Sequence, residues 1–218
     1  MSDNDIEQLL AVAVEAYRQL PSQIAVGTAI EAITGKVVVP LSVNREDTEL
    51  VERIGKAATA LIADSKVTPI KTGRLNELGN AIEQPLLNAL LAEGLAASWP
   101  KRADGSGGRS GYPDIAIDAA GERPTYLEAK VVGVGSEGSS FRSFYLSPSE
   151  RPKVCYDARH LLVAFTHHRE ADDLAGLEQY SLLNYKIVDL ARVFGKIKFE
   201  YQSCNKDMYL GDAVVLKG

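Results

Sequence analysis

Two neighbouring segments set the architecture of this chain: Gly111-Tyr112-Pro113-Asp114-Ile115-Ala116-Ile117 and Pro124-Thr125-Tyr126-Leu127-Glu128-Ala129-Lys130-Val131-Val132. Both have the apolar and β-branched character of strands, and the short connection between them contains turn formers. We therefore expect an antiparallel hairpin. Because side chains alternate between the two faces of a strand, Glu128 and Lys130 share one face, and Asp114 faces away from the core. The hairpin places Asp114 across from the Glu128 region.

This pairing brings two carboxylates and one ammonium to one point on a sheet. Carboxylate oxygens suit a hard divalent cation, and an ammonium beside them suits the positioning of a water molecule. Such an arrangement fits phosphodiester hydrolysis. The alternative is structural, because the charges of Glu128 and Lys130 would also fit an exposed cross-strand ladder with Asp114 as a turn residue.

Pro113-Asp114 followed by Glu128-Ala129-Lys130 resembles the PD-(D/E)XK nuclease motif, in particular that of type II restriction endonucleases. The resemblance implies an α/β fold with a central mixed β-sheet flanked by helices. It also implies that Asp114 and Glu128 ligate Mg²⁺ and that Lys130 orients or activates the attacking water. The implied activity is hydrolysis of double-stranded DNA at a short specific sequence.

The resemblance implies one further acid, contributed by the helix before the hairpin. Glu83 occupies a helical stretch at residues 80–91 and is the candidate for that catalytic role. Asn80 lies three residues earlier, so the pair also fits a capping box in which Glu83 reaches back to the start of the helix. Pro85 leaves the start or the straightness of this helix open. Both interpretations of Glu83 stay open at this point.

The net charge of −5 and the pI of about 5.3 are unusual for a DNA-binding protein. Binding depends on the local field, however, and basic residues gather around the hairpin. The candidate DNA contacts are Arg109, Ser140, Arg142, Ser143 and Lys153. A homodimer is expected, since a two-fold protein matches a palindromic site and supplies one active centre for each strand.

Other functions remain as alternatives. Another nuclease of the same superfamily would act in repair or junction resolution, and a noncatalytic module would use the hairpin only as a binding surface. The glycines of residues 133–138 have the spacing of a dinucleotide fingerprint. The residues that follow lack a helical pattern and soon reach Pro148, so we interpret this stretch as a loop.

We expect a helical region at residues 1–70 that packs on a nuclease core at residues 71–218. Helices are predicted at 5–17 and from about 44 through Leu61, and a buried strand at 160–166, ended by paired histidines. Another strand at 180–190 is predicted to lead into a helix. No apolar run is long enough for a membrane span, and two cysteines, Cys155 and Cys204, suit a reducing cytoplasm.

Overall fold

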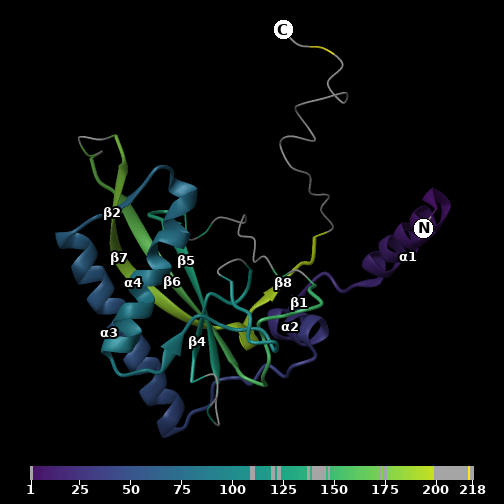
Figure 1. Cartoon of the computed structure of the whole chain (residues 1–218), viewed down its shortest axis with the longest axis horizontal. Helices are drawn as coiled ribbons and strands as arrows, with labels where there is room; N and C mark the ends of the chain where they lie inside the picture. Colours follow the sequence, from purple (N-terminus) through teal and green to yellow (C-terminus); the bar gives the residue numbers. More distant parts are fainter. Residues whose placement is uncertain are drawn as a thin grey trace. The chain divides into compact units, whose positions relative to one another are not determined.

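Figure 1 shows the protein as a computed structural model. The residues it describes are 2–108, 111–118, 121, 124–136, 138, 146, 148–171, 173, 176–198 and 216. The chain divides into two compact units, of which one comprises residues 25–193 and the other the chain before and after this range. The candidate site lies in the unit of residues 25–193.

Within the described ranges, a six-stranded sheet runs in the order β2-β7-β6-β5-β4-β3. Its strands are β2 (Ile70–Thr72), β3 (Ala97–Ser98), β4 (Ile115–Ile117), β5 (Thr125–Gly133), β6 (Arg159–Arg169) and β7 (Glu178–Asp189). The pair β5–β6 is parallel, and the other pairs are antiparallel. The predicted α/β fold with a central mixed sheet is confirmed, as is the hairpin of β4 and β5.

Three helices belong to this unit in its described residues: α2 (Val26–Thr34), α3 (Arg45–Val67) and α4 (Leu78–Ala92), the last preceded by the 3-10 turn η1 (Leu75–Glu77). Asn44 caps α3, because its side chain accepts a hydrogen bond from the backbone N–H of Asp47 at 2.7 Å. The predicted cap at Asn80 is wrong: α4 begins two residues earlier, so Asn80 lies inside the helix. Pro85 also lies inside α4.

One face of the sheet forms the main core. Figure 1 shows α3 and α4 side by side next to the sheet, and both helices contact it. The strands contribute Leu127, Ala129, Leu161, Val163 and Phe165, and the helices contribute Ile54, Leu61, Ile82, Leu86 and Leu90. Each large side chain buried in this way stabilises the fold by about 1.5–3 kcal/mol.

The opposite face of the sheet carries a much smaller apolar cluster. Ala116, Tyr126, Val154 and Ala158 are buried there, and Tyr112 packs against them. Asp114, Glu128 and Lys130 follow the same alternation as Ala116 and Tyr126 along β4 and β5. The motif side chains therefore lie on the face that the helices α3 and α4 do not cover.

Two strand ends differ from the prediction. β6 continues through the paired histidines to Arg169, with a register shift between Thr166 and His167. The helix predicted after β7 is wrong, because the chain forms only the 3-10 turn η2 (Leu190–Arg192), which Asp189 caps. Gly195 lies soon after, in the short strand β8 (Phe194–Gly195).

The other unit contains the predicted N-terminal helix, which is α1 (Asp3–Gln19). A capping box begins it: the Asp5 N–H donates to the Ser2 hydroxyl, and the Ser2 N–H donates to the Asp5 carboxylate. The two-residue strand β1 (Ile24–Ala25) pairs with β8. Among the described helices, none is long and apolar enough to cross a membrane. The predicted division at residue 70 stays a prediction.

Candidate active site

The hairpin aligns the two acids of the motif. Ile115 pairs with Leu127 in antiparallel register, so the next position outward sets Asp114 opposite Glu128. The Asp114 carboxylate accepts a hydrogen bond from the backbone N–H of Ala129 at 2.9 Å. Because this donor belongs to β5 itself, the position of the Asp114 side chain is coupled to that of the strand that carries Glu128.

Lys130 completes the cluster on the same face. Its ammonium donates a hydrogen bond to Oε1 of Glu128, and the side chain of Lys130 remains 27% exposed. Glu128 is only 5% exposed. Burial raises the pKa of Glu128 to about 7; the charge of Asp114 acts in the same direction, and Lys130 lowers the pKa. The site therefore resists a second negative charge unless a cation compensates for it.

The second oxygen of Glu128 shows where such a cation would fit. Oε2 is buried and has no hydrogen-bond donor in the described part of the chain. A buried carboxylate oxygen without a donor beside a second carboxylate is unfavourable by itself and is a suitable ligand for a hard cation. Three or more His, Cys, Asp or Glu side chains do not gather into a metal-binding group anywhere in the described residues. The arrangement therefore offers two carboxylates, with the remaining ligands left to water and substrate.

Glu83 lies on α4, which contacts β5, and its side chain is 6% exposed. The structure does not bring Glu83 into a three-carboxylate group with Asp114 and Glu128. Glu83 does lie close enough to influence the pKa of Lys153. Burial lowers that pKa, and the charges of Asp114, Glu128 and Glu83 act in the opposite direction. The catalytic role of Glu83 stays a prediction.

Tyr112 and His160 form a pair on the face of the sheet that carries the acids, and they were not predicted as site residues from the sequence. The Tyr112 hydroxyl and Nδ1 of His160 are 2.5 Å apart, and the two rings stack with centroids separated by 5.8 Å. Burial lowers the pKa of His160 to about 4, so its imidazole is neutral at neutral pH. Only the parallel register, in which Tyr126 pairs with His160, brings this histidine from β6 to the hairpin.

Four of the predicted DNA contacts, Arg109, Ser140, Arg142 and Ser143, lie outside the described residues. Lys153 is described, and it is 4% exposed in the connection between β5 and β6. Its ammonium donates to the backbone carbonyl of Pro113 at 2.5 Å. A lysine in a polar connection resembles a solvated residue, and no local pattern in the sequence signals this burial.

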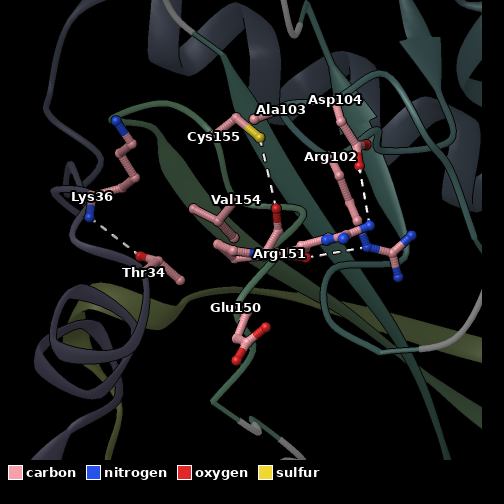
Figure 2. Close-up of a pocket in the computed structure, with 10 residues that line it drawn as sticks. Thr34, Lys36, Arg102, Ala103, Asp104, Glu150, Arg151, Val154 and Cys155 are labelled. Carbon is pink, nitrogen blue, oxygen red and sulfur yellow. Dashed lines mark hydrogen bonds and ion pairs between the residues drawn. The ribbon is translucent and has the colours of Figure 1, made fainter.

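A hollow of about 520 Å³ lies next to the segment that carries Lys153. Figure 2 shows the side chains of Arg102 and Arg151 at one end of it. The guanidinium of Arg102 donates to the Arg151 carbonyl at 3.1 Å, and that of Arg151 pairs with Asp104 at 3.6 Å. Lys36 contributes a third positive side chain to the lining. Asp104 and Glu150 also line the hollow, so positive side chains exceed negative ones there by one, on a protein whose net charge is −5.

Comparison with known proteins identifies the family of this chain. The profile of the type II restriction enzyme MjaV family matches residues 21–212. The type II restriction enzyme MjaV of Methanocaldococcus jannaschii is 31% identical to this chain over 231 aligned residues, which cover 99% of this chain and 97% of that protein. No solved structure matches significantly. The chain belongs to the type II restriction enzyme MjaV family.

Proposed function

We propose that this protein is a magnesium-dependent endonuclease of the PD-(D/E)XK superfamily that hydrolyses double-stranded DNA at a short specific sequence. The observation that carries the proposal is the alignment of Asp114 with Glu128 beside the ammonium of Lys130. Family membership supports a restriction endonuclease, and the full-length similarity to a relative of that name supports it further.

Asp114 and Glu128 would hold the ion, since they supply oxygen ligands and one Glu128 oxygen lacks a donor. Bound Mg²⁺ would supply Lewis-acid stabilisation of the charge that develops on the phosphoryl oxygens. Lys130 remains partly exposed beside Glu128 and is suited to hold the attacking water and to stabilise its hydroxide form. Glu83 on α4 would add a negative charge that favours the positive charges of the site, including that of Lys153.

The substrate is proposed to be DNA because a phosphate backbone matches both a cation bound by the acids and the nearby arginine side chains. Arg102 and Arg151 present guanidinium groups next to the Lys153 segment, and guanidinium binds phosphate in a bidentate manner.

We also propose a homodimer, which would cut both strands of a palindromic site. Light scattering would measure the molar mass of this dimer. Cys155 is a free thiol, which is consistent with a cytoplasmic protein.

Digestion of plasmid and long linear DNA tests the proposal. The wild-type protein with Mg²⁺ should give a fixed set of fragments, and Ca²⁺ in place of Mg²⁺ should not support cleavage. Asp114→Asn and Lys130→Met should each lower the cleavage rate by about 100- to 1000-fold, because each removes a group that stabilises the transition state.

Lys66→Met is the matched control. Lys66 is exposed in the last turn of α3, which packs on the opposite face of the sheet. The cleavage rate of the Lys66→Met protein should therefore equal that of the wild type. Full activity of Lys130→Met would refute the proposed site. Degradation of DNA without fixed fragments would refute sequence specificity and would favour a repair or junction nuclease.

A further inference from the structure

We propose that Lys153 is a positioning residue of the active site: its buried ammonium holds the backbone carbonyl of Pro113 and thereby keeps Asp114 opposite Glu128. This inference rests on the proposed function, because it assigns Asp114 to a metal site. It differs from the DNA-contact role predicted for Lys153, which requires an ammonium that is accessible to phosphate.

The contacts of Lys153 point to the backbone that precedes Asp114. Its Nζ lies 2.5 Å from the carbonyl oxygen of Pro113 and 3.5 Å from that of Gly108. Asp114 is the next residue after Pro113, and its carboxylate accepts from the Ala129 N–H at 2.9 Å. The segment is thus held from two sides, the side chain of Asp114 by β5 and the backbone by Lys153.

The segment that carries Lys153 is itself anchored to the sheet. Val154 is buried with Ala116 and Tyr126 on the face of the motif. The backbone N–H of Cys155 donates to the Tyr126 hydroxyl at 2.9 Å. These two contacts fix the backbone immediately after Lys153. The position of its ammonium is therefore restrained as well.

The electrostatic setting of Lys153 offsets part of the cost of burying its charge. The charge of a lysine that is only 4% exposed is costly unless negative charge or hydrogen-bond acceptors compensate for it. Burial lowers the pKa of Lys153, and the charges of Asp114, Glu128 and Glu83 act in the opposite direction. Two backbone carbonyls accept hydrogen bonds from the ammonium. Lys153 is therefore matched to the acids of the site as well as to Pro113.

The test is a metal titration of Lys153→Met, which keeps the length of the side chain and removes the donor. Cleavage is measured against Mg²⁺ concentration, and the thermal shift produced by Ca²⁺ is measured as a binding readout that needs no cleavage. The half-saturating concentration of both ions should rise by about 10- to 100-fold, as for other residues that orient metal ligands. The KM for DNA should stay within about twofold of the wild type, since DNA does not reach a buried ammonium.

Lys71→Met is the control, because Lys71 also has a partner, Asp173 at 3.0 Å, but lies on the edge strand β2. Its metal dependence should equal that of the wild type. An unchanged half-saturating concentration in Lys153→Met would overturn the inference. A decrease would overturn it too, because it would mean that Lys153 only competes with the metal as a positive charge.

If Lys153→Met does not fold, Lys153→Gln carries the test. Its amide keeps a donor on a shorter stem, so the half-saturating concentration should rise in the same direction by a smaller factor, and an unchanged value overturns the inference. Failure of the proposed function looks different: the wild-type protein itself would then not cleave DNA. In that case the Ca²⁺ thermal shift still compares Lys153→Met with the wild type.

Discussion

Two neighbouring residues on opposite faces of the central sheet are buried to a similar extent and have opposite chemistry. Leu127 is fully buried against the helices, and Glu128, the next residue along β5, is only 5% exposed on the other face. Burial stabilises the fold at Leu127, whereas at Glu128 it raises the pKa of a carboxyl group to about 7. One face of β5 therefore stabilises the fold, whereas the other face buries a carboxyl group of the active site at an electrostatic cost to stability.

The largest effect is expected on the apolar face. Phe165→Ala removes a fully buried ring from β6 and should lower the free energy of unfolding by about 3–5 kcal/mol, because the surrounding core collapses only partly into the space. Chemical denaturation measures this change. Leu183→Ala is the control, since Leu183 lies on β7 and is 41% exposed, and it should cost much less. Equal losses in the two variants would break the contrast between core and surface positions.

A smaller effect of opposite sign is expected on the polar face. Glu128→Gln should raise the Tm of the metal-free protein at pH 8 while it abolishes cleavage. A carboxyl group whose folded-state pKa lies above its unfolded value of about 4.5 binds its proton more tightly in the folded state. Its contribution to stability is therefore lost as the pH rises from about 4.5 through about 7, and glutamine removes that loss.

Thermal denaturation in EDTA at pH 5 and pH 8 checks the prediction for Glu128. The gain in Tm should be present at pH 8 and nearly absent at pH 5, where the glutamic acid is protonated. Glu52→Gln, a substitution at an exposed position of α3, should change the Tm at neither pH. A Glu128→Gln protein that is less stable than the wild type at pH 8 would contradict the inference that burial of the ionised Glu128 carboxylate destabilises the fold.

The smallest effect is expected at the pair formed by Tyr112 and His160. Tyr112→Phe removes the hydroxyl that lies 2.5 Å from Nδ1 of His160 and should cost about 1–3 kcal/mol, because a buried imidazole nitrogen loses its partner. Denaturation of this variant beside Tyr156→Phe, whose side chain is 49% exposed, measures the difference. Identical stabilities would show that the pair contributes only packing.

The hairpin and the orientation of its side chains could be predicted because both depend on local pattern. Alternation along a strand sets Glu128 and Lys130 on one face, and a short turn-forming connection sets Asp114 opposite Glu128. The helix boundaries were less predictable. Asn80 matched a capping box in spacing, but α4 begins at Leu78, and packing of its apolar face decided where the helix starts.

Local periodicity thus suffices to place the acids and the lysine of the motif, because neighbours along a strand and across a tight hairpin are close in sequence. Distant partners require the parallel pairing of β5 with β6. That pairing brings His160 to Tyr112 across 48 residues and Lys153 to Pro113 across 40 residues. Only the folded chain determines these contacts, because burial, which makes a lysine or a histidine part of a site, is a property of segments that are far apart in the sequence.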